Sequence, residues 1–181
     1  YMPRKYGNMI RYETLRMIKR WLLLSLVRQI LALDKRILLG MSALHKPILS
    51  TVMIVITHLG DKGIIWIAIG LAYLIGKQDK KTGAKVLLAL LFSLLFPNGI
   101  IKTAVMRQRP YMSMDLTPLI EKDRGWSFPS GHTSASFAAA IVLLINRKWK
   151  GVPYVLLAAL IAFSRLYIQV HYPLDVLGGF I

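Results

Sequence analysis

Three short polar segments of the chain carry the side chains needed to bind and attack a tetrahedral oxyanion. They read KTAVMRQRP at 102–110, FPSGHT at 128–133 and SRLYIQVHYPLD at 164–175. Among their charged and titratable residues we single out three cations, two histidines and one carboxylate: Lys102, Arg109, Arg165, His132, His171 and Asp175. Such a set suits holding an anion by fixed charge, attacking it, and protonating the oxygen that leaves.

The first segment spaces its two key cations by seven residues. On a helix, Lys102 and Arg109 would therefore lie on one face about two turns apart, and Pro110 would end that helix. The simpler interpretation is a basic helix end whose side chains reach lipid headgroups.

The second segment is a tight turn directly before an apolar run. A helix that begins at Gly131 presents free backbone N–H groups and a partial positive charge, which suit a phosphate. Ser130 can add a hydroxyl donor, and His132 is placed to exchange a proton with a bound group. The alternative is an ordinary N-cap with an incidental histidine.

The third segment contains a cation within an apolar helix, followed by a histidine and a carboxylate. Arg165 near the end of an apolar helix is unfavourable without an anionic partner. His171 and Asp175 are four residues apart around Pro173. A carboxylate at one imidazole nitrogen fixes the tautomer and makes the other nitrogen more nucleophilic, although such a pair is often only a structural hydrogen bond.

We expect no metal and no cofactor. Magnesium and calcium need several oxygen ligands, and carboxylates are scarce here. Zinc held by the two histidines and Asp175 is conceivable, but the surrounding cations oppose it. The chain has no cysteine, which excludes disulfides, cysteine-ligated zinc and thiol catalysis.

Composition indicates that a bilayer surrounds these segments. The chain has 181 residues, of which 55% are hydrophobic, a mean hydropathy of +0.51 and a net charge of +16. Nucleic-acid binding also fits the charge, but such a domain would not need the apolar runs. We predict one all-α domain over residues 1–181, a polytopic membrane helix bundle of about six transmembrane helices with short interfacial helices.

The expected elements follow the apolar runs. A basic amphipathic segment at about 1–20 should contact anionic headgroups, and no removable signal peptide is expected. Residues 34–47 should form a polar connection with a short amphipathic piece, 107–128 a loop, and Pro97 a bend. The expected spans are 21–33 (which crosses or lies in the interface), 63–76 extended backwards, 84–106, 131–145, 152–170, and one that starts near 173.

Charge predicts the orientation of the bundle. The basic residues between the second and third spans and between the fourth and fifth share one face with the basic N-terminus: Lys77, Lys80, Lys81, Lys85, Arg147, Lys148 and Lys150. By the positive-inside rule that face is cytoplasmic. We therefore expect a multi-pass plasma-membrane protein whose three polar segments lie on the extracytoplasmic face.

At the three polar segments the chain resembles the type 2 phosphatidic acid phosphatase (PAP2) superfamily, which also includes acid phosphatases and vanadium haloperoxidases. The family pattern K-x6-RP, PSGH and SR-x5-H-x3-D stands complete at 102–110, 129–132 and 164–175. The resemblance covers roughly residue 34 to the end, and the apolar helices between the blocks match the membrane branch.

The resemblance implies a role for each matched residue. The phosphate-binding residues would be Lys102, Arg109, Arg165, Ser130 and the backbone N–H of Gly131. His171 would form a phosphohistidine with Asp175 orienting it, and His132 would protonate the leaving oxygen and then activate water. Cations would replace the metal ions used by other phosphoryl-transfer sites.

The resemblance also implies a lipid phosphate substrate, with undecaprenyl diphosphate favoured by analogy alone. Phosphatidic acid, phosphatidylglycerol phosphate and the 1-phosphate of lipid A remain alternatives. Headgroup choice would involve the 107–128 loop, with candidates Tyr111, Lys122, Arg124 and Trp126. A transporter or channel is disfavoured because the polar residues gather at one end, and a non-catalytic lipid-binding relative because His171 is present. No nucleic acid and no obligate protein partner are expected.

Overall fold

The computed structural model describes residues 4–76, 79–123 and 125–181. Side chains 4–12 and 14 are not described, and the predictions that rest on residues 1–3, Lys77 and Arg124 lie outside the described residues. Within the described residues the secondary structure is entirely helical, which agrees with the all-α prediction.

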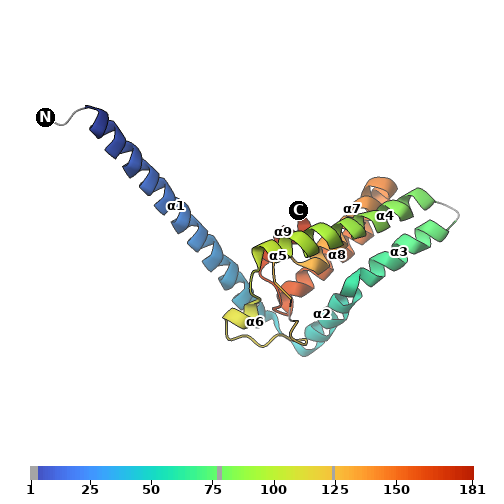
Figure 1. Ribbon diagram of the computed structural model, residues 1–181. Coiled ribbons are helices and arrows are strands. Elements are labelled where there is room, and N and C mark those ends of the chain that lie inside the picture. The colour runs from blue at the N-terminus through green and yellow to red at the C-terminus, as the bar shows by residue number, and fades with distance from the viewer. Residues whose placement is uncertain (1–3, 77–78, 124) are drawn as a thin grey trace. The chain divides into compact units, whose positions relative to one another are not determined.

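The elements follow one another as helices, most of them joined by short turns, with a longer non-helical connection between α6 and α7 (Figure 1). The α-helices are α1 (Arg4–Met41), α2 (Pro47–Leu59), α3 (Ile64–Ile75), α4 (Lys80–Ser93), α5 (Lys102–Val105), α6 (Pro110–Ser113), α7 (Gly131–Arg147), α8 (Val152–Tyr167) and α9 (Pro173–Phe180). Three 3-10 turns at Ser42–Leu44, Asp61–Gly63 and Lys148–Gly151, and one π-helical segment at Leu94–Ile101, link them.

The chain divides into two compact units, residues 1–37 and 38–181. Helix α1 runs without a break to Met41, so the polar connection does not start at residue 34 as expected, and the amphipathic piece at 34–41 is the last part of α1. Lys35 and Arg36 have good helix propensity, and no proline lies between the start of α1 and Pro47. The charged residues there are tolerated within a helix.

Two helical stretches of the described residues are long and apolar enough to cross a membrane, Lys80–Ser113 and Gly131–Tyr167. The pair α2 and α3 makes a third if the two are counted as one span bent by 43°. The membrane class of the prediction therefore has structural support, whereas the expected number of about six spans is not confirmed.

Four helices of the second unit share one apolar core. Helices α3 and α4 lie side by side, and α7 packs against both α4 and α8 (Figure 1). Trp66 of α3 is fully buried, and its Nε1 donates to Ser136 Oγ of α7 over 2.9 Å. Gly83 lets α4 approach α3, since a Cβ there would lie 2.4 Å from the backbone nitrogen of Leu74. This core fixes the helix ends that carry the polar segments.

The segment around Pro97 remains helical by widening into π-helical turns. Proline has no N–H to donate to the carbonyl of Ser93, four residues earlier. The Asn98 side chain replaces that donor, with its Nδ2 3.0 Å from the Ser93 oxygen. At the expected bend the chain therefore stays helical, in wider π-helical turns that continue to Lys102.

Candidate active site

A cavity of about 700 Å³ lies in the second unit, lined by α3, α4, the π-helical segment, α5 and the first turn of α7. Its polar lining residues are Lys62, Ser93, Asn98, Lys102, Arg109, Asp123, His132 and His171. Five of the eight predicted site residues line it, Gly131 among them, whereas Ser130, Arg165 and Asp175 do not. The three polar segments of the sequence thus meet at one cavity.

The two cations of the first segment reach the cavity by a route that the sequence did not predict. Helix α5 ends at Val105, where Met106 adopts a left-handed φ of 49°. Pro110 starts α6 instead of ending a helix, because its missing N–H is tolerated in a first turn. Lys102 and Arg109 therefore do not share a helix face, and the turn at Met106 brings them to the same cavity.

Lys102 is held by the π-helical segment that precedes it. Its Nζ lies 3.4 Å from Asn98 Oδ1. Asn98 in turn packs against the start of α7, since a Cβ at Gly131 would lie only 2.3 Å from its Oδ1. A residue larger than glycine at this position would displace the amide that contacts Lys102.

Arg109 is 2% exposed, and each of its guanidinium nitrogens has a partner. Nε donates to the Gly125 carbonyl at 2.8 Å, Nη1 contacts the Val170 carbonyl and His171 Nε2, both at 3.3 Å, and Nη2 contacts Asp123 Oδ2 at 2.5 Å. Partial burial raises the pKa of Asp123, but the Gly125 N–H and Arg109 outweigh it and hold that pKa below its ordinary value. No motif or spacing in the sequence pointed to Asp123.

His171 and Asp175 are buried beside one another. His171 Nδ1 lies 3.6 Å from Asp175 Oδ2, while Nε2 faces Arg109. Burial lowers the pKa of His171 from 6.5 to about 3, so its ring is neutral near neutral pH. Because Arg109 donates to Nε2, this network assigns the proton to Nδ1 and a lone pair to Nε2.

The start of α9 fixes the carboxylate of that pair. Asp175 is the third residue of the helix and accepts from the Tyr172 N–H at 2.8 Å, which closes a capping box. Two residues that the sequence interpretation missed complete its coordination. Ser127 Oγ donates to Oδ2, and Arg107 Nη1 contacts Oδ1 at 2.6 Å. Arg107 lies within the first polar segment, so its charge was a signal that was available.

In the second segment, one residue caps helix α7 and two residues line the cavity. Ser130 Oγ accepts from Thr133 N at 3.5 Å and from Thr133 Oγ1 at 3.0 Å, so it caps α7, and Ser130 is fully buried. Gly131 and His132 line the cavity. His132 Nε2 lies 2.9 Å from Oδ1 of Asp61, a carboxylate in the turn between α2 and α3.

Arg165 lies at the end of α8 and is 3% exposed. Its Nη1 donates to Thr57 Oγ1 over 2.6 Å. Its Nε has no hydrogen-bond partner among the described residues. A buried donor without a partner is unfavourable, so this position suits an anion supplied from outside the chain.

No group of three or more histidine, aspartate or glutamate residues in the described part of the chain is arranged to hold a metal ion. The donors around the cavity are mainly cations, which suit an oxyanion better than a metal.

Comparison with known proteins gives consistent matches. The model of the PAP2 superfamily matches residues 82–181. An undecaprenyl-diphosphatase of Sulfolobus acidocaldarius is 33% identical over 65% of this chain and 57% of its own length. The undecaprenyl-diphosphatase BcrC of Bacillus subtilis is 30% identical over 76% of this chain and 70% of its own.

Two crystal structures resemble the fold. One is a transmembrane PAP2-type phosphatidylglycerolphosphate phosphatase from Bacillus subtilis, with a TM-score of 0.68, 28% identity, and coverage of 84% of this chain and 79% of its own. The other is LpxE of Aquifex aeolicus, with a TM-score of 0.69, 28% identity, and coverage of 83% and 87%.

Proposed function

The chain belongs to the PAP2 superfamily, and we propose that it is an integral-membrane phosphatase that hydrolyses a phosphate ester or anhydride on a lipid headgroup. One observation carries the proposal. A neutral, buried imidazole with its Nε2 lone pair beside Arg109 lines the same cavity as Lys102 and His132.

The cavity lining suits an amphipathic substrate. Leu87, Leu90, Leu94, Asn98 and Lys102 all line it and follow one another at spacings of three or four residues. They therefore form one stripe of about 20 Å along the helix, apolar at one end and polar at the other. A lipid with its chain along the leucines would have its phosphate at Lys102.

In the first step His171 Nε2 attacks phosphorus and forms an N–P bond. The bond from phosphorus to the leaving oxygen breaks, and His132, entering protonated, gives its proton to that oxygen. Asp175 supports the positive charge that develops on the His171 ring. Lys102 and Arg109 hold the non-bridging oxygens, with the free Nε of Arg165 as a further donor.

In the second step water hydrolyses the phosphohistidine. His132 takes a proton from water as the water oxygen attacks phosphorus. The N–P bond breaks, inorganic phosphate leaves, and His132 is again protonated for the next cycle. The same residue thus acts first as an acid and then as a base, and His171 recovers its lone pair.

As substrate we favour undecaprenyl diphosphate. The names of the Sulfolobus acidocaldarius and Bacillus subtilis relatives support this choice. Phosphatidylglycerol phosphate is the second candidate, supported by the phosphatase from Bacillus subtilis whose crystal structure matches the fold. Phosphatidic acid and the 1-phosphate of lipid A complete the set.

We place the site on the extracytoplasmic face of the plasma membrane. Lys80, Lys81 and Lys85 begin α4, and Lys148 and Lys150 follow the end of α7. The polar lining residues Lys102 and His132 lie beyond the other end of α4 and in the first turn of α7. Because the chain has no native cysteine, single substitutions report topology directly. A membrane-impermeant maleimide should label Asp115→Cys but not Lys148→Cys in intact cells, and the reverse pattern would invert the orientation.

The activity is tested by phosphate release from the four lipids in detergent. The wild type should release phosphate from at least one, and His171→Ala should release none. The variant should elute from gel filtration and unfold on heating as the wild type does, which would show that its loss of activity is not caused by unfolding. Unchanged turnover by His171→Ala would refute the nucleophile assignment, and no release by the wild type from any lipid would refute the proposed function.

The covalent intermediate has its own test. Alkaline quenching during turnover followed by mass spectrometry should find an acid-labile phosphoryl group on the peptide that contains His171. Phosphate release without such a peptide, under conditions that preserve a phosphohistidine standard, would favour direct attack by water.

A further inference from the structure

The turn between α2 and α3 lies against the histidine that begins α7. The two helices meet at a 43° bend, and Lys62 and Gly63 within it have left-handed φ values of 51° and 71°. A non-glycine residue in this conformation is uncommon and is maintained by its surroundings. The bend interrupts an apolar pair of helices and turns Asp61 toward α7.

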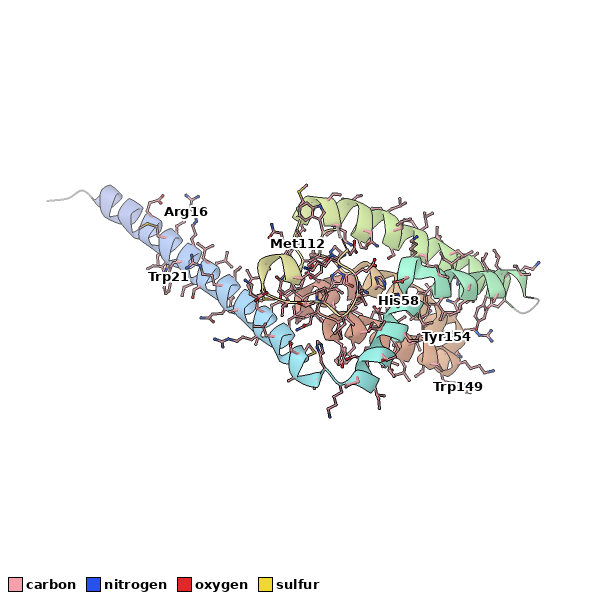
Figure 2. All side chains as sticks on the ribbon, turned by 90° about the horizontal axis from the view of Figure 1, so that it is seen from below. Arg16, Trp21, His58, Met112, Trp149 and Tyr154 are labelled. Atoms are coloured by element: carbon pink, nitrogen blue, oxygen red, sulfur yellow. The ribbon has the colours of Figure 1, made fainter. Side chains whose placement is uncertain are left out.

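Contacts at the bend converge on His132. Its Nε2 lies 2.9 Å from Asp61 Oδ1, and the other carboxylate oxygen lies 2.7 Å from His58 Nδ1. Figure 2 shows His58 on α2. Gly60 allows the ring to lie flush against the turn, because a Cβ there would be 2.9 Å from His132 Cδ2. The imidazole is thus fixed through one nitrogen and one ring edge.

This arrangement leaves one ring nitrogen for chemistry. Since Nε2 contacts a carboxylate, it carries a proton, and Nδ1 is the nitrogen that remains for exchange with a group in the cavity. His132 lines that cavity together with Gly60, Lys62 and Gly63 of the bend. None of the three polar sequence segments contains Asp61, so sequence spacing gave no reason to connect it with the site.

We propose that Asp61 is a positioning residue that holds His132 through Nε2 and supports its protonated form, so that Nδ1 delivers and recovers the proton of the reaction. The inference rests on the proposed function. The Nε2 proton stays on the ring throughout, the Nδ1 proton passes to the leaving oxygen, and water returns it. Asp61 remains an ionised carboxylate and takes no proton itself.

The first test is the substitution Asp61→Asn, with Asp115→Asn as the matched control. Asp115 is an exposed aspartate of the 107–128 loop, so its change removes the same charge away from the cavity. We expect Asp61→Asn to lower kcat/KM for short-chain phosphatidic acid about 30-fold. For p-nitrophenyl phosphate, whose leaving group needs no protonation, we expect a loss of less than about threefold. Asp61→Glu should restore part of the activity.

The second test is a double-substitution cycle with His132→Ala, run on whichever of the four lipids the wild type hydrolyses fastest. If Asp61 acts through His132, adding Asp61→Asn to His132→Ala should change turnover by less than about twofold. A purely structural role would reduce turnover in both backgrounds and for both leaving groups.

The outcomes separate this inference from the proposed function. If the wild type releases phosphate, three results would each overturn the positioning role alone. The Asp61→Asn variant could lose equal activity for both leaving groups, it could have activity that matches the wild type, or its effect could be additive with that of His132→Ala. No release by the wild type from any lipid would overturn both.

Discussion

The burial of His171 links the stability of the fold to pH, and this link can be measured without a substrate. Above pH 6.5 the imidazole is neutral in the folded and the unfolded chain. Between 6.5 and about 3 the unfolded chain binds a proton that the folded protein excludes. The free energy of unfolding therefore falls as the pH falls through this range, at up to about 1.4 kcal/mol per pH unit.

The size of the effect follows from that interval. Lowering the pH from 8 to 4.5 should remove about 3 kcal/mol through His171 alone. For a chain of this length, about 2 to 4 °C of Tm corresponds to each kcal/mol, so the fall is about 6 to 12 °C. The substitution His171→Gln removes the titrating group and keeps a polar side chain of similar size.

The assay is thermal unfolding in detergent between pH 8 and pH 4.5 for the wild type and His171→Gln. Groups that titrate elsewhere affect both proteins, so the difference between their Tm values isolates His171. The wild type should lose about 6 to 12 °C more than the variant on acidification. Parallel curves for the two proteins would show that His171 is protonated as readily in the folded state and would refute the burial argument.

Three further predictions concern the neighbours of the site and its independence of metal. Ser127→Ala should lower kcat about tenfold, because Asp175 loses a donor and orients His171 less well; a change below twofold in phosphate release contradicts this. Gly131→Ala should reduce turnover and lower the Tm by a few degrees, because its Cβ would lie 2.3 Å from Asn98 Oδ1; wild-type values for both measurements would show that Asn98 moves freely. EDTA should leave wild-type phosphate release unchanged, and a loss that added metal restores would overturn the metal-free mechanism.

Much of the fold was readable because apolar runs and helix signals are local. Proline near the first position of α2, α8 and α9 and the serine cap of α7 mark helix starts. The errors arose where local signals compete. Residues 34–41 stay helical despite their charges, and the chain leaves the helix at Met106, four residues before the proline expected to end it. Neither outcome follows from composition alone.

The sequence by itself determined which chemistry we propose for the candidate site, because the three polar segments together supply the cations, histidines and carboxylate that phosphoryl transfer would use. Tertiary structure alone decided which groups support them. Asp61, Asp123 and Ser127 lie outside those segments and reach His132, Arg109 and Asp175 through turns and packing. The neutral state of His171 is likewise a tertiary property, since it depends on burial that no local pattern of residues encodes.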